Sequence, residues 1–212
     1  FQYGFKSPDV DAIPYAVWFI CGIVPWLYVT ESFSSASNCF IEYNYLIKKV
    51  KFNVVILPLV KILSAFYIHI FFCLIAVGVA VGLKVWPTVY IIQLLYYMVA
   101  NIILLFALSL ITSSIVVFFR DLNQIISVIL LIGMWGTPIA WTLAGFPEAI
   151  HKYFKLNPFF YIIEGYRDAI LGRQWFWEHP HLTLYFWVFV IILLVIGGRI
   201  YVKLRPHFAD TV

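Results

Sequence analysis

The chain alternates long apolar stretches with short polar connections, and five of the apolar stretches are long enough to cross a membrane. The hydrocarbon core of a bilayer is about 30 Å thick, a distance that about 20 residues of α-helix can span. The five stretches cover residues 13–35, 54–83, 89–119, 125–141 and 182–200. This pattern predicts an all-α integral membrane protein, built as a polytopic helical bundle.

A shorter segment between the fourth and fifth stretches carries several charges. Asn157 and Pro158 favour a helix start and Gly172 favours a stop, so this helix is only about 20 Å long. Its charged residues are Glu164, Arg167 and Asp168. Because such side chains face lipid only at high cost, we expect the helix to lie in the interface or to re-enter the membrane against protein.

A second short helix is expected just before this one. Pro147 suits its first turn and Glu148 its positive end, whereas Lys152 and Lys155 suit its negative end. The two short helices, residues 146–172, then form a cap over one mouth of the bundle.

Residues 37–50, between the first two stretches, predict another short helix. Phe40, Tyr43 and Ile47 share one face of it, with Glu42 and Lys49 away from that face. The periodicity fits two interpretations equally well. The helix either lies on lipid headgroups or docks a cytoplasmic partner.

Charge placement favours one orientation. Lysines 48, 49 and 51 and the C-terminal Arg/Lys cluster lie at span ends on the same side as Arg120. Positive residues beside spans favour the cytoplasm, so this side is predicted to be cytoplasmic. Asp121 is expected to cap the fourth span, in a tight turn that makes the third and fourth spans antiparallel neighbours.

Composition supports a membrane protein and excludes several other classes. The chain is 64% hydrophobic and 11% charged, with a mean hydropathy of +0.96, whereas soluble domains carry about 25% charged residues. A net charge of +4 is too small to suggest nucleic acid. The three cysteines have no CxxC spacing and are interpreted as packing residues, with no metal site. Because the chain begins without Met, we expect an N-terminal piece to be missing.

Three polar residues fall inside the predicted spans. Glu31 and Lys61 lie near the same membrane face, where they either form an ion pair or reach the interface separately. His69 lies mid-span and is expected to be a hydrogen-bonded packing residue rather than a proton relay. The chain has no P-loop, no HExxH motif and no Ser/His/Asp grouping at a readable spacing, so we predict no catalytic site in it.

Four motifs in order carry a resemblance to a known family. They are Pro25-Trp26 with Glu31, residues 44–52 followed by 56–58, residues 118–123, and residues 156–158 with 164–168. Together they resemble the permease subunit of ABC exporters that move lipid-linked polysaccharides. Details in 133–141 and 165–168 look most like the wall teichoic acid exporters of Gram-positive bacteria.

The resemblance implies an architecture and a set of partners. It implies one transmembrane domain over residues 1–212, six spans in the full chain, a coupling helix over 37–50 and extracellular gate helices over 146–172. Two permeases and two ATP-binding cassette subunits would form the transporter in the plasma membrane, surrounded by membrane lipid. The chain itself would bind no cofactor, because ATP and Mg would be used by the ATPase partner.

The resemblance also implies site residues. The expected contacts with the ATPase subunit are Phe40, Glu42, Tyr43, Tyr45, Ile47, Lys48 and Lys49. Trp26 and Trp135 are candidate channel residues that would stack on sugar rings. The candidates for the gate and exit are Lys155, Glu164, Arg167 and Asp168, with Arg167 or Lys155 contacting phosphate and Glu164 pairing with Arg167.

The predicted function is therefore the membrane subunit of an ATP-driven exporter of lipid-linked teichoic acid. The alternative within the same class is an O-antigen or capsular polysaccharide permease. A membrane-embedded transferase using His69 or His151 is a more distant alternative, and a structural scaffold is a further one.

Overall fold

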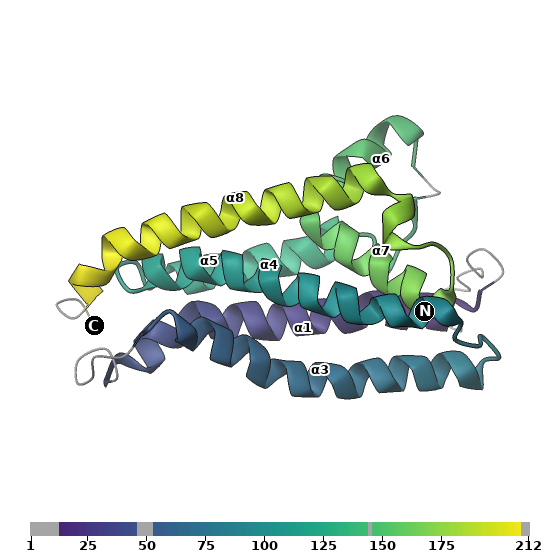
Figure 1. Ribbon diagram of the computed structural model, residues 1–212, viewed down its shortest axis with the longest axis horizontal. Helices are drawn as coiled ribbons and strands as arrows, with labels where there is room; N and C mark the ends of the chain where they lie inside the picture. Colours follow the sequence, from purple (N-terminus) through teal and green to yellow (C-terminus); the bar gives the residue numbers. More distant parts are fainter. Residues whose placement is uncertain (1–12, 46–52, 144–145, 209–212) are drawn as a thin grey trace.

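A computed structural model describes residues 13–45, 53–143 and 146–208 as an all-helical bundle (Figure 1), which confirms the predicted fold class. The α-helices are α1 (Tyr15–Glu42), α3 (Ile56–Gly82), α4 (Gln93–Val116), α5 (Leu122–Gly136), α6 (Glu148–Phe154), α7 (Pro158–Leu171) and α8 (Pro180–Leu204). Short 3-10 helices are η1 (Val89–Ile92), η3 (Phe176–Glu178) and η4 (Arg205–His207).

Four of these elements are long and apolar enough to cross a membrane: α1, α3, η1 with α4, and α8 with η4. The fourth predicted span, α5, is apolar but has 15 residues. Its helix measures about 22 Å, which is less than a bilayer's hydrocarbon core. The chain leaves α5 in an extended conformation at Thr137, so the helix ends before the predicted 141.

The helix α1 is the centre of the bundle, because it packs against α3, α4, α5 and α7. Residues on all its sides are consequently buried, among them Val17, Trp18, Cys21 and Trp26. The helices α3 and α8 lie on the outside of the bundle (Figure 1) and expose many large apolar side chains, as lipid-facing helices do.

The two ends of the bundle differ. At one end, here called the α7 end, α6 and α7 lie beside the first turns of α1 and α8 (Figure 1). At the other, the C-terminal end, Phe208 contacts the rings of Phe40 and Phe118 at centroid distances of 5.3 and 6.1 Å. This aromatic cluster ties the last turn of α1 and the end of α4 to the end of α8.

The sequence predicted the boundaries of α7 correctly. The Asn157 side chain accepts a hydrogen bond of 3.0 Å from the backbone N–H of Phe159, and Pro158 occupies the first turn. Gly172 ends the helix in the left-handed conformation, at φ 69°. Local capping chemistry is therefore sufficient to define this helix.

The structure corrects the start predicted for the helix over residues 37–50, whereas residues 46–50 lie outside the described part of the chain. The helix α1 continues without a break to Glu42, so Ser37 and Asn38 lie inside a helix and do not start one. Phe40 is 0% exposed and packs in the aromatic cluster at the C-terminal end. Asp121 precedes α5 as expected, but its side chain makes no capping hydrogen bond.

Candidate functional site

The short helix α7 carries the candidate site, and its Arg167 side chain anchors this helix to the bundle. The Arg167 side chain is 0% exposed, and its Nη1 donates to Glu164 Oε1 at 2.5 Å. Its Nη2 donates to the Ile139 carbonyl at 3.0 Å. The guanidinium also lies over the Trp18 ring, with its carbon 3.6 Å from the centroid. One side chain thus joins α7 to α1 and to the segment after α5.

This geometry confirms the Glu164–Arg167 pair and corrects the role expected for Arg167. A guanidinium that is fully buried and held by a carboxylate, a carbonyl and an indole ring has no surface for a phosphate. Gly22 makes room for it, because a Cβ at Gly22 would lie 2.6 Å from Nη2. Arg167 is therefore a structural anchor.

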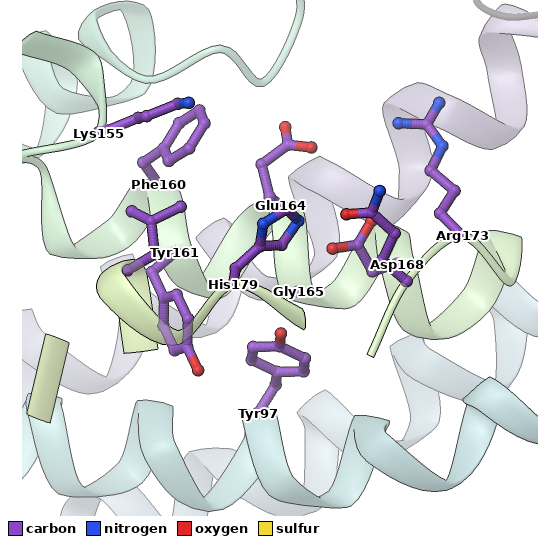
Figure 2. Close-up of a pocket in the computed structure, with 11 residues that line it drawn as sticks. Tyr97, Lys155, Phe160, Tyr161, Glu164, Gly165, Asp168, Arg173 and His179 are labelled. Atoms are coloured by element: carbon purple, nitrogen blue, oxygen red, sulfur yellow. The ribbon is translucent and has the colours of Figure 1, made fainter. Parts of the chain in front are cut away.

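A cavity of about 280 Å³ opens beside α7. It lies between α7, α4 and the segment leading into α8 (Figure 2). Its lining combines aromatic, acidic and basic side chains: Tyr97, Lys155, Phe160, Tyr161, Glu164, Gly165, Asp168, Arg173, Gln174, His179 and Leu182. Three of the four residues predicted for the gate and exit, all except Arg167, therefore meet at one cavity.

Asp168 is the most perturbed acid of this cavity. Among the described residues, its carboxylate has no hydrogen-bond partner. Burial, and secondarily the nearby Glu164 carboxylate, raise the pKa of Asp168 to about 7. Because this carboxylate borders the cavity and has a perturbed pKa, it is a candidate for accepting hydrogen bonds from a bound molecule.

Aromatic rings form the floor of the cavity. Tyr97 points from α4 toward Gly165 on α7 (Figure 2), and a Cβ at Gly165 would lie within 2.0 Å of the Tyr97 ring. The Tyr161 hydroxyl is held in place by Tyr96 at 2.9 Å and by Thr183 at 3.1 Å. The rings are consequently fixed by α4, α7 and α8 together.

Comparison with known proteins decides the family. Residues 1–171 match the family model described as ABC-2 type transporter. The chain belongs to the ABC-2 type transporter family. It is therefore a transport subunit and a multi-pass protein of the plasma membrane.

Several ABC-2 relatives are similar along almost the whole chain. Two proteins of Klebsiella pneumoniae, both named O-antigen export system permease protein RfbA, are 30% and 27% identical over 99% of this chain and 81% of their own length. A protein of the same name from Myxococcus xanthus is 25% identical over 100% of this chain and 87% of its own length.

The C-terminal end of this ABC-2 subunit holds the residues expected to contact an ATPase. Phe40 is buried, so it is not part of a contact surface. Glu42 forms an ion pair with Lys61, with 2.7 Å between Glu42 Oε1 and Lys61 Nζ. The same Nζ lies 4.9 Å from the centroid of the Tyr43 ring. Tyr45 is 52% exposed, so its side chain is accessible to a partner protein. The predicted contacts Ile47, Lys48 and Lys49 lie outside the described residues.

The ion pair predicted between Glu31 and Lys61 is wrong. Lys61 reaches Glu42, which lies three helical turns beyond Glu31 on α1. Glu31 is exposed and faces a polar groove with Asn123 and Ser127 of α5. Because α1 runs on to residue 42, its last turn brings a nearer carboxylate to the lysine.

The two candidate channel tryptophans lie in different environments. Trp26 is 2% exposed and packs edge-on against Phe159, 5.5 Å between centroids, so within this chain it is a core residue and lines no open surface. Trp135 is 59% exposed on α5, and its role in a channel stays a prediction.

His69 and Tyr166 form a hydrogen bond of 2.7 Å in the middle of the bundle. Both are buried, and the His69 ring stacks on Tyr28 at 4.4 Å. This is the hydrogen-bonded packing histidine that the sequence favoured.

Sequence reasoning missed several residues that build the site. Trp18, Gly22 and Tyr97 lie on other helices and are brought to α7 only by the fold. Tyr97 sits within an apolar run, where an aromatic residue is unremarkable. A glycine within a span, such as Gly22, is a weak signal of close approach that could have been followed.

Proposed function

We propose that the chain is the membrane-spanning subunit of an ATP-driven exporter of a lipid-linked polysaccharide of the O-antigen type. A separate ATP-binding cassette subunit would hydrolyse the ATP and bind its Mg. The observation that carries this proposal is similarity along 99% of the chain to relatives named O-antigen export permeases. As in the family that the motifs resemble, two such chains and two ATPases would make the transporter.

The cavity at the α7 end favours O-antigen over teichoic acid as the substrate. A poly-phosphate chain calls for cations along its route, and Arg167, one of the two expected there, is fully engaged inside the protein. Lys155 and Arg173 line the cavity, but Glu164 and Asp168 line it too. Such a balanced lining suits a polymer that is not densely anionic.

We assign the C-terminal end to the cytoplasm and the α7 end to the outer face. Arg120 lies in the turn between α4 and α5, and Lys203 and Arg205 lie at the end of α8, so all three are at the end where positive residues favour the cytoplasm. The α6–α7 pair then forms an outward-facing gate over the polymer's exit.

Rigid-body motion of α1 is the coupling mechanism that the packing supports. At the C-terminal end α1 is joined to α3 by Glu42–Lys61 and to α8 by the aromatic cluster. At the α7 end Arg167 lies against the Trp18 ring of the same helix. An ATPase that pushes on the residues around Tyr45 would therefore tilt α1 and carry α7 with it.

Reconstitution tests this function. The full-length protein and its ATP-binding cassette partner would be placed in lipid vesicles with a lipid-linked O-antigen, or with a lipid-linked teichoic acid in parallel. ATP-dependent protection of the O-antigen inside the vesicles is expected. Transport of teichoic acid but not of O-antigen would show that teichoic acid is the substrate. Product formation without any ATPase would support a transferase.

A further inference from the structure

We propose that the cavity at the α7 end is a binding site for a single pyranose ring of the exported polymer. The inference rests on the proposed export of a polysaccharide and adds a specific saccharide subsite at the exit. It would hold the polymer weakly after each forward step while the ATPase resets.

Aromatic rings supply the first part of the argument. A pyranose presents apolar C–H faces, which stack on aromatic side chains. Phe160, Tyr161 and Tyr97 line the cavity from α7 and α4. The Tyr161 hydroxyl is already bonded to Tyr96 and Thr183, so this ring is held in place before any ligand arrives. Preformed platforms of this kind lower the cost of ordering a site on binding.

Carboxylates supply the second part. Asp168 is largely buried, borders the cavity and, within the described chain, accepts no hydrogen bond. Glu164 Oε1 is engaged by Arg167, which holds the Glu164 side chain at the edge of the cavity. Two neighbouring hydroxyls of a sugar are donors that a carboxylate binds well. A sugar bound in the cavity could thus donate to the carboxylates of Asp168 and Glu164, which line it.

The charge balance distinguishes a sugar from an anion. Lys155 and Arg173 line the cavity together with Glu164 and Asp168. A phosphate near Asp168 would meet a like charge, whereas a neutral ring uses both kinds of group, donating to the acids and accepting from the bases. Gln174 and His179 also line the cavity and could add polar contacts to a bound sugar.

Saturation-transfer NMR on the full-length exporter in lipid nanodiscs tests the site. The probes are a panel of methyl pyranosides, with inorganic phosphate and glycerol phosphate as rival ligands. We expect saturation of the sugar ring protons with at least one pyranoside, and no displacement by either phosphate compound. Absence of transfer from every pyranoside, or displacement by the phosphates, would overturn the proposal.

Variants locate the signal. Asp168→Asn keeps the shape of the side chain, and Lys155→Ala changes an exposed side chain with little risk to folding. Each is expected to weaken sugar binding at least threefold, whereas Asp121→Asn, an exposed acid at the opposite end, leaves it unchanged. Equal signals from all three variants would place binding elsewhere and overturn the site.

Export measured on the same preparations separates this inference from the function. ATP-driven export by the parent protein without any sugar binding at the cavity overturns the subsite alone. Failure of the parent to export any polysaccharide overturns the proposed function.

Discussion

At the scale of single residues, Arg167 illustrates how a charge is accommodated deep in a membrane protein. Every side of its guanidinium meets protein: Glu164 on the same helix, the Ile139 carbonyl after α5 and the Trp18 ring on α1. The cost of burying the cation is offset only while all of these contacts are present. Arg167 is therefore one of the main contacts that fix α7 against α1 and the segment after α5.

Replacing Arg167 by Ala should consequently destabilise the protein by about 3 kcal/mol, because it leaves Glu164 without its partner and opens a cavity. Thermal unfolding in detergent measures the loss, and leakage of polymer measures the gate. Lys152→Ala, which removes an exposed cation from α6, is the control. Unaltered unfolding, transport and leakage in the Arg167 variant would contradict both the anchor and the gate role.

Gly22 gives a second test, since any side chain at this position collides with Arg167 Nη2. We expect Gly22→Val to lower the unfolding temperature and to reduce export. Gly78→Val is the matched control, because a Cβ at Gly78 meets nothing within 4 Å. Equal behaviour of the two variants would show that Arg167 is not packed against α1.

The raised pKa of Asp168 predicts that the stability of the protein depends on pH. Because its pKa in the folded protein is raised from 3.8 to about 7, the folded state binds the proton more tightly than the unfolded state does. The free energy of unfolding is therefore highest in acid, where both states bind the proton. It falls as the pH rises from about 4 toward 7, because the unfolded state then ionises first. Asp168→Asn should be more stable than the parent at pH 8, by up to about 4 kcal/mol, and nearly equal to it at pH 4. Parallel stability curves for the two proteins would contradict the burial of this acid.

At the scale of elements, locally encoded features were predicted and long-range ones were not. Helix α7 was found because Asn157, Pro158 and Gly172 define its ends within the helix itself. The end of α1 was missed, since the burial of Phe40 depends on Phe208, 168 positions later in the chain. For the same reason the cavity was only partly predicted: Lys155, Glu164 and Asp168 were named, but the aromatic residues that line it, among them Tyr97 from α4, were not.

The ion pair between α1 and α3 can be tested by exchange. Glu42→Lys places two cations together and should lower stability by about 0.5 kcal/mol, a small effect because Glu42 is partly exposed. The double variant Glu42→Lys with Lys61→Glu restores an attraction and should recover most of this loss. Thermal unfolding of the parent and the single and double variants gives the coupling, and purely additive effects would mean that the pair contributes nothing.

The same variants test coupling between transport and ATP hydrolysis. If Glu42 acts only by joining α1 to α3, the double variant should export normally. If instead Glu42 contacts the ATPase directly, as the resemblance implied, the double variant should hydrolyse ATP without export.

At the scale of the whole molecule, α1 connects the two ends that function would have to link. It is 28 residues long, about 42 Å, and touches α7 at one end and α3 and α8 at the other. A push from an ATPase at the C-terminal end would therefore reach the gate at the α7 end through one continuous helix. This coupling requires an ATP-binding cassette subunit to contact the exposed end of that helix.

The most direct measurement is a photocrosslink from a reactive amino acid placed at Tyr45, in native membranes, followed by identification of the captured protein. Tyr45 is suited to this because it is 52% exposed and lies just beyond α1. We expect capture of an ATP-binding cassette subunit, whereas a reactive residue at Tyr67, which is 77% exposed on the lipid-facing helix α3, should capture lipid. Capture of lipid alone from both positions would contradict coupling through this end of the bundle.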